Sequence, residues 1–315
     1  VVGTLAFLIR YNLTKLYIQR KFKMLSYNEE PIYEALNNRW SVLFHQVAGL
    51  VVFNSSIIII SIFVGLKGSS VYAIYNTVFN ALIMIITMFS KSTVSSFGNL
   101  ISIENSDKLR DVFLRYQVLF YAFGTWLYTV AYIMINPFIK LYTSGVNDTA
   151  YSDSLLAVLF TIIGILNMIR VPNNTMIEAS GHYKQTQNRA FTEAVINISI
   201  SLIFVQIVGI YGVLIGSLCS YIYRSLDIII YSSKHILGIN SKITFILLSP
   251  NLLISTLVVL SISNFVNLQV ATWYDWIKYA SIISVVTGCI ILILNNIIHK
   301  GFIKNTAYSL KSLIS

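Results

Sequence analysis

The sequence has 315 residues, of which 56% are hydrophobic and 11% are charged, and its formal net charge at pH 7 is +10. Soluble domains carry about 25% charged residues, so this composition excludes a soluble protein. Uncharged segments such as 40–66 and 243–274 exceed the roughly 20 residues that a helix needs to cross a bilayer. We therefore predict an all-α, polytopic transmembrane helix bundle.

The chain begins with the apolar run VVGTLAFLI, which contains no basic segment and no cleavage site of a signal peptide. Because this run is also too short to span a bilayer, we expect residues 1–10 to be the end of a truncated transmembrane helix. The chain would then be the C-terminal part of a longer protein. Residues 11–40 are first basic and then acidic, which indicates a cytoplasmic linker.

Apolar runs and helix breakers predict about eight full spans after the truncated helix. They are expected near residues 42–65, 69–92, 116–136, 154–175, 187–208, 210–232, 244–264 and 279–299. We expect residues 41–235 to form a six-helix bundle at the C-terminal side of the linker. Residues 236–315 would add two transmembrane helices and a cytoplasmic tail.

The lysines and arginines test this arrangement, because basic residues concentrate in cytoplasmic loops. Most of the 22 lie in alternate connections, whereas the opposite side holds only Lys67, Lys140 and Lys278. The basic connections are therefore expected on the cytoplasmic side, together with the C-terminus. Membrane topology accounts for the positive charge, so we expect membrane lipids around the chain and no nucleic acid partner.

The second span carries a polar stripe. Asn76, Asn80, Thr87 and Lys91 fall within an arc of about 60° on a helix with 3.6 residues per turn. An ammonium group facing lipid is costly, so this stripe is expected to face protein or water. In the alternative interpretation, Lys91 extends to the headgroups at the cytoplasmic surface.

The first span also has one polar face, which includes Asn54, and His45 lies on the neighbouring face near the cytoplasmic end. An imidazole there is a candidate proton carrier. The alternative is an interfacial histidine with a satisfied hydrogen bond.

In the fourth span, Asn167, Arg170 and Asn174 share one helix face, and Pro172 lies between them. Proline removes a backbone donor, so the helix should bend or end there. Interrupted helices line cavities in transporters. The alternative is an ordinary helix end at the membrane surface.

The fifth span contains Arg189, Glu193 and Asn197 at intervals of four residues. Arg189 and Glu193 can pair along the helix at this spacing. A carboxylate inside the membrane is unusual, and we consider both a functional role for Glu193 and a purely structural ion pair.

At the start of the sixth span, Gly212 and Gly216 have the GxxxG spacing that lets two helices approach closely. Arg224 and Asp227 follow near the cytoplasmic end and are expected to pair with each other.

The sequence contains no catalytic constellation and no metal-binding spacing. The four histidines are scattered, and the two cysteines, Cys219 and Cys289, lie in separate apolar runs. We therefore expect a protein that is not an enzyme, with no catalytic residue, no metal and no cofactor.

One segment carries a family resemblance. From Val171 to Arg224 the sequence reads VPNNTMIEASGHYKQTQNRAFTEAVINISISLIFVQIVGIYGVLIGSLCSYIYR. This segment resembles polysaccharide flippases of the multidrug/oligosaccharidyl-lipid/polysaccharide exporter superfamily. The matching features are a proline before an ASG turn, a helix with the pattern ExxxN, and a glycine-rich helix entry. At these positions the chain has Pro172, Ala179, Ser180, Gly181, Glu193, Asn197, Gly209, Gly212 and Gly216.

The resemblance implies the second half of a MATE-like two-bundle transporter with 12 or 14 helices around a central cavity. Such proteins move lipid-linked oligosaccharides across the membrane by alternating access. The chain would thus carry an undecaprenyl-pyrophosphate-linked oligosaccharide across the bacterial cytoplasmic (inner) membrane for surface polysaccharide biosynthesis. Contact with a glycan polymerase and other assembly proteins is a further expectation.

Candidate roles follow from this function. Lys91, Arg170 and Arg189 lie toward the cytoplasmic side and are expected to bind the pyrophosphate. The candidate ligands for sugar hydroxyl groups are Asn54, Tyr72, Asn76 and Asn80. For ion coupling, Glu193 and His45 are candidates for H⁺, and Glu193 with Asn197 for Na⁺.

Two other functions stay open. A multidrug exporter of the same superfamily would carry substrates that are often cationic, which a cavity rich in lysine and arginine disfavours. A glycan polymerase would be expected to have a large external loop, whereas the longest one predicted here covers only about residues 137–153.

Overall fold

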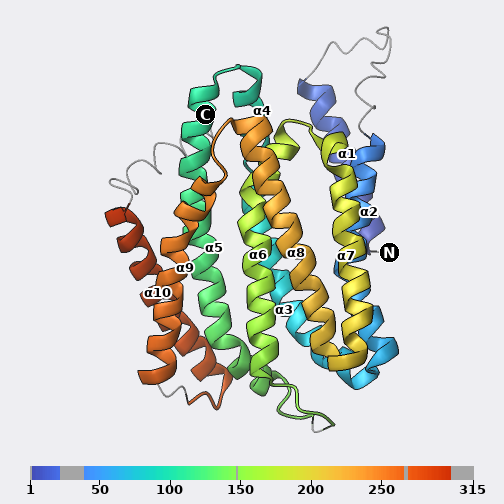
Figure 1. Cartoon of the computed structure of the whole chain (residues 1–315), viewed down its shortest axis with the longest axis vertical. Helices are drawn as coiled ribbons and strands as arrows, with labels where there is room; N and C mark the ends of the chain where they lie inside the picture. The colour runs from blue at the N-terminus through green and yellow to red at the C-terminus, as the bar shows by residue number, and fades with distance from the viewer. Residues whose placement is uncertain (1, 22–38, 147, 266–268, 299–315) are drawn as a thin grey trace. The chain divides into compact units, whose positions relative to one another are not determined.

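The computed structural model describes residues 2–21, 39–146, 148–265 and 269–298, and no strand occurs among them (Figure 1). The chain divides into two compact units, residues 1–39 and 40–315. The first unit contains helix α1, Val2–Lys21. This helix covers both the predicted end of a truncated span and the first part of the predicted linker. The rest of that linker, residues 22–38, lies outside the described residues.

The second unit is a bundle of long helices (Figure 1). Eight segments of the described chain are long and apolar enough to cross a membrane. Their helices are α2 (Arg39–Phe63), α3 (Leu66–Lys91), α5 (Ser106–Tyr142), α6 (Ser154–Ala179), α7 (Tyr183–Val208), α8 (Ile210–Ser232), α9 (Lys242–Phe265) and α10 (Trp273–Ile298). The short helix α4 (Val94–Ser102) follows α3, and the π-helix η2 (Ser233–Leu237) extends α8. The prediction of an all-α polytopic membrane bundle is confirmed.

Consecutive long helices run in opposite directions, so the connections alternate between the two ends of the bundle (Figure 1). We call the end at which α3, α6 and α8 finish the basic end. Lys67, Lys140 and Lys278 lie close to the other end, in the first turn of α3, the last turn of α5 and the second turn of α10. The two-sided charge distribution expected from the sequence is therefore present in the described part of the bundle.

Helix α5 is longer than predicted. Its 37 residues correspond to about 55 Å, which exceeds the thickness of the hydrocarbon core. The helix starts ten residues before the predicted span because Asn105 caps it, with its side-chain oxygen accepting a hydrogen bond from the Lys108 amide at 3.0 Å. It also continues through Pro137 to Tyr142, into the predicted external loop.

Helix α6 continues past Pro172 to Ala179, so the proline does not end the helix. A proline inside a helix removes one backbone hydrogen bond and disturbs the preceding turn. In that turn, the Tyr121 hydroxyl on α5 donates a hydrogen bond to the Ile169 carbonyl at 3.0 Å. A side chain from the neighbouring helix thus bonds to the backbone in the turn that precedes the proline.

The other end of α6 is fixed by Asp153. Its Oδ1 accepts hydrogen bonds from the Leu155 and Leu156 amides at 2.7 and 3.1 Å. The Tyr211 hydroxyl on α8 donates to Oδ2 of the same carboxylate at 2.5 Å, and the Tyr75 hydroxyl on α3 donates to the Asp153 carbonyl at 2.9 Å. These bonds hold three helices together at the end opposite to the basic end.

Helices α7 and α8 pack backbone to backbone. A Cβ atom added at Gly212 would lie 2.2 Å from the Phe204 carbonyl carbon, and one added at Gly216 would lie 2.2 Å from Ser201 Oγ. The packing role predicted for the GxxxG spacing is therefore confirmed. A single residue, Gly209, connects the two helices, and its φ of 60° is a conformation that glycine adopts without strain.

Helices α9 and α10 lie beside α5 (Figure 1). A buried pair of amides joins α9 to α10. Asn295 Nδ2 donates to Asn251 Oδ1 at 2.7 Å. We expect Asn251→Ala to lower the free energy of unfolding by about 1 kcal/mol, because hydrogen bonds between membrane helices contribute about that much. The measurement is the thermal unfolding midpoint in detergent. Thr256→Ala is the matched control, since its exposed hydroxyl bonds only to its own helix, and equal shifts would contradict the prediction.

Candidate functional site

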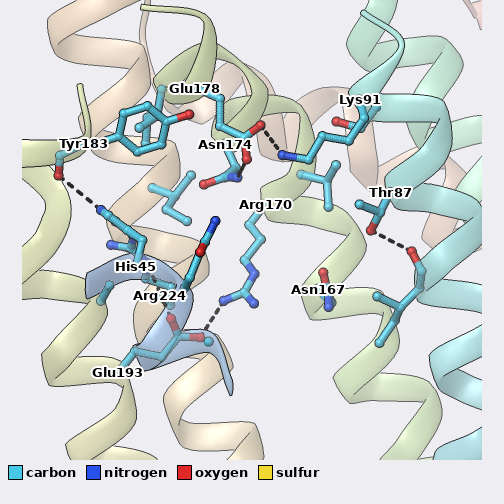
Figure 2. Close-up of a pocket in the computed structure, with 18 of the residues that line it drawn as sticks. His45, Thr87, Lys91, Asn167, Arg170, Asn174, Glu178, Tyr183, Glu193 and Arg224 are labelled. Atoms are coloured by element: carbon cyan, nitrogen blue, oxygen red, sulfur yellow. Dashed lines mark hydrogen bonds and ion pairs between the residues drawn. The ribbon is translucent and has the colours of Figure 1, made fainter. Parts of the chain in front are cut away.

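A polar cavity lies inside the membrane bundle, toward the basic end. Its volume is about 360 Å³, and its walls come from α2, α3, α6, α7 and α8. Figure 2 shows charged side chains from several of these helices pointing toward the same space. The polar and charged residues of the lining are His45, Gln46, Thr87, Ser90, Lys91, Asn167, Arg170, Asn174, Glu178, Tyr183, Glu193 and Arg224. We refer to this space as the charged cavity.

Five charged residues form one continuous set of ion pairs beside this cavity. Arg170 Nη1 lies 2.6 Å from Glu193 Oε1, and Arg224 Nε lies 3.5 Å from Glu193 Oε2. Arg224 Nη1 in turn lies 2.8 Å from Asp227 Oδ2, and Arg189 Nη1 lies 2.6 Å from Asp227 Oδ1. This charge network contains three cations and two anions, and therefore has a net charge of +1.

Burial explains why the members of the network are paired. Only 4% of the Arg224 side chain and 10% of the Glu193 side chain are exposed. An isolated ion at such a site is costly unless an opposite charge and hydrogen bonds compensate it. The Arg170 guanidinium also lies 4.4 Å from the centre of the Tyr221 ring, a distance typical of a cation–π interaction.

The network corrects one prediction and confirms another. Arg189 pairs with Asp227 on α8, and the predicted pair with Glu193 along α7 is wrong. Glu193 points instead toward α6 and α8, where two guanidinium groups are available. The predicted pair of Arg224 with Asp227 is present.

A second ion pair lies at the basic end of the cavity. Lys91 Nζ on α3 lies 2.5 Å from Glu178 Oε2 on α6 (Figure 2). Asn174 Nδ2 donates a hydrogen bond to the other oxygen of this carboxylate at 2.9 Å. Lys91 therefore belongs to the cavity, as the stripe on its helix indicated.

Sequence reasoning missed Glu178 and Arg224 as cavity residues. The signal for Glu178 was present, because it follows Arg170 and Asn174 at intervals of four residues and so extends the same helix face. Arg224 was recognised only as a partner of Asp227, since nothing in the sequence indicates that it also reaches Glu193 on the neighbouring helix.

His45 lines the charged cavity and is hydrogen-bonded. Its Nε2 lies 3.1 Å from the Tyr183 carbonyl and 3.1 Å from Thr186 Oγ1 (Figure 2).

In the turn between α6 and α7, burial lowers the pKa of His182, and the nearby His235 lowers it further. Both effects favour the neutral form of the His182 imidazole.

Three of the four predicted sugar ligands line a smaller cavity. Tyr72, Asn76 and Asn80 surround a space of about 40 Å³ together with residues of α2, α6 and α8. Phe53 and Ile83 belong to the walls of both cavities. The two spaces are therefore neighbours, with the three predicted ligands placed farther from the basic end than the charges.

Other predicted site residues lie elsewhere. Asn54 is exposed and outside the lining of both cavities, and its amide donates to the Leu50 carbonyl of its own helix at 2.8 Å. Arg189 is outside the lining of the charged cavity and joins the network through Asp227.

Asn197 is buried in a separate polar cluster. It accepts a hydrogen bond from Ser55 Oγ at 3.1 Å, and its amide lies 3.3 Å from the hydroxyls of both Ser217 and Ser220. The two oxygens of Glu193 face guanidinium groups. In the structure the carboxylate and the amide that we considered as a joint Na⁺ site therefore have different partners. Within the described ranges, no group of three or more acidic, histidine or cysteine side chains is placed to hold a metal ion.

Comparison of the chain with known protein families, with curated proteins and with solved structures found no match. The functional proposal therefore depends on the chemistry of the charged cavity. Lysine and arginine side chains around a cavity within an apolar helix bundle are suited to bind an anion, because charge attraction is strong where water is scarce.

Proposed function

We propose that this chain is part of a transporter that moves an undecaprenyl-pyrophosphate-linked oligosaccharide across a bacterial cytoplasmic membrane by alternating access. The observation that supports the proposal best is the convergence of Lys91, Arg170 and Arg224 on one cavity inside a membrane bundle. The resemblance of residues 171–224 to polysaccharide flippases of the exporter superfamily supports it independently. In this function, the basic end and the C-terminus face the cytoplasm, where the lipid-linked substrate is made.

The cavity fits the anionic headgroup of such a substrate. Guanidinium groups bind phosphate oxygens through two parallel hydrogen bonds, and an ammonium group binds them as a point charge. A volume of about 360 Å³ is at the lower end of the range for ligand pockets. It accommodates a diphosphate with its first sugar, so the remaining glycan would extend beyond it. The adjacent cavity at Tyr72, Asn76 and Asn80 has a volume of about 40 Å³, so it would have to widen before these side chains could bind sugar hydroxyls.

A multidrug exporter of the same superfamily fits the cavity less well. Its substrates are often cationic, and the three basic side chains of the lining outnumber the two carboxylates. Like charges would raise the free energy of a bound cation in this space.

The proposal predicts that Lys91→Met reduces transport about tenfold, the effect of losing one hydrogen bond to a charged group. We would express the variant in cells lacking the gene and quantify single lipid-linked repeats on the cytoplasmic leaflet. Lys140→Met is the matched control, because Lys140 is an exposed lysine near the other end of the bundle.

Accumulation of single repeats on the cytoplasmic leaflet with Lys91→Met, and not with Lys140→Met, is the expected result. Single repeats exposed on the outer leaflet would indicate a polymerase. An unchanged glycan profile in cells lacking the gene, together with increased sensitivity to cationic dyes, would indicate drug export.

A further inference from the structure

The two carboxylates of the charged cavity are held in different ways. Glu193 lies between two guanidinium groups, those of Arg170 and Arg224. Glu178 contacts one cation, Lys91, and one neutral amide, that of Asn174. Removing one cation therefore leaves Glu193 with an opposite charge, but leaves Glu178 without one at hydrogen-bonding distance.

The two sites also differ in exposure. The Lys91 side chain is 57% exposed and Glu178 is 18% exposed, whereas Arg224 is almost completely buried. Ion pairs that include an exposed partner contribute little to stability, because water competes for both charges. The Lys91–Glu178 pair is thus the one that an incoming anion can separate at the lowest cost.

Lys91 is the cation that pairs with Glu178 in the described part of the bundle. The ionisable groups that interact with Glu178 lie on four neighbouring helices: His45 on α2, Lys91 on α3, Tyr116 on α5 and Tyr183 on α7. The neighbouring helix α4 has no ionisable side chain. On α8 the nearest charges are Arg224 and Asp227, which pair with each other, and Arg170 on α6 itself pairs with Glu193.

The charge balance changes when a diphosphate enters. Three cations and two carboxylates give the lining a net charge of +1. A diphosphate that is esterified at both ends, as in the proposed glycosylated substrate, carries about two negative charges, so its binding would change the net charge to about −1. One proton on a carboxylate would restore neutrality, which a site of low dielectric constant favours.

We propose that an incoming diphosphate displaces Glu178 from Lys91, and that the released carboxylate takes up one proton from water at the basic end. A diphosphate oxygen replaces Glu178 Oε2 at the Lys91 ammonium, and the proton binds to a carboxylate oxygen of Glu178. The neighbouring anion favours the protonated form, because two like charges in one site repel each other. Substrate binding and proton uptake are thereby coupled at this residue. This inference rests on the proposed function, since it takes a diphosphate as the ligand.

The test measures proton uptake during binding. We would titrate the purified chain with farnesyl diphosphate by calorimetry at neutral pH, in buffers that differ in their enthalpy of ionisation. The wild-type chain is expected to take up about one proton per ligand more than Glu178→Gln, because any proton that the terminal phosphate of the ligand releases is common to both. Glu178→Gln is also expected to bind about three- to tenfold more tightly, because the competing carboxylate is gone. Asp111→Asn removes a carboxylate from an exposed ion pair with Arg115 and is expected to behave like the wild type.

The outcomes separate the two proposals. If the wild-type chain binds farnesyl diphosphate and Glu178→Gln takes up the same number of protons, the exchange at Glu178 is refuted and the transporter proposal stands. If the wild-type chain does not bind the lipid, both proposals fail. If inorganic pyrophosphate binds with the same affinity as farnesyl diphosphate, the site is assigned to the free anion and not to the lipid.

Infrared difference spectra of the wild type give a second test that needs no variant: a protonated carboxyl band must appear when the ligand binds.

Discussion

Glu193→Gln is expected to lower the free energy of unfolding by about 3 kcal/mol, because it removes one partner of a buried ion pair. Arg170 would keep its positive charge but lose the carboxylate that now lies 2.6 Å away. Arg224 would retain only Asp227. The thermal unfolding midpoint in detergent, followed by fluorescence-detected size-exclusion chromatography, measures the effect.

A double variant separates the lost ion pair from other consequences of the substitution. Combining Glu193→Gln with Arg170→Met removes the uncompensated cation, and should restore part of the stability lost in Glu193→Gln alone. Asp111→Asn is the control for the loss of an exposed pair and should shift the midpoint little. Additive losses in the double variant would show that the two residues do not stabilise each other.

Gly212→Ala should have an effect of similar size for a steric reason. The new Cβ would lie 2.2 Å from the Phe204 carbonyl carbon, 2.3 Å from its oxygen and 2.5 Å from the Val205 nitrogen. These are backbone atoms of α7, so no side-chain rotation can relieve the overlap. Overpacking of this kind costs about 3 kcal/mol, and the two helices would have to move apart.

Gly49→Ala is the matched control for this prediction. Gly49 lies inside α2, and an added Cβ there meets no atom within 4 Å. Since alanine favours helix more than glycine does, this variant should be as stable as the wild type or slightly more stable. If Gly212→Ala unfolds at the same temperature as Gly49→Ala, the close approach of α7 and α8 does not contribute to stability.

The helices could be predicted from the sequence because their length and apolar character are local properties. The expected spans overlap the eight membrane-compatible helices. The predicted ends of one span are wrong, because Asn105 caps α5 earlier than expected and α5 continues through Pro137. Helical periodicity also places Lys91 and Arg170 on faces that turn toward the cavity.

The partners of these residues could not be predicted, because they depend on how each helix is rotated against its neighbours. Arg189 and Glu193 have the spacing of an ion pair within one helix, yet each is bonded to a residue of another helix. Asn54 has the polarity expected of a cavity residue but satisfies its amide on its own backbone. It can therefore lie on an exposed surface at little cost.

Four of the five residues in the charge network belong to a single helical hairpin, α7 and α8. That hairpin turns at one residue, Gly209, and its two arms approach each other closely at Gly212 and Gly216. Its two arginines and two carboxylates neutralise each other without help from outside. Arg170 on α6 is the one member contributed by a separate helix, and it sits two residues before Pro172. A sliding motion of α6 along the hairpin would therefore break one ion pair of this network, and would separate the Arg170 guanidinium from its carboxylate partner.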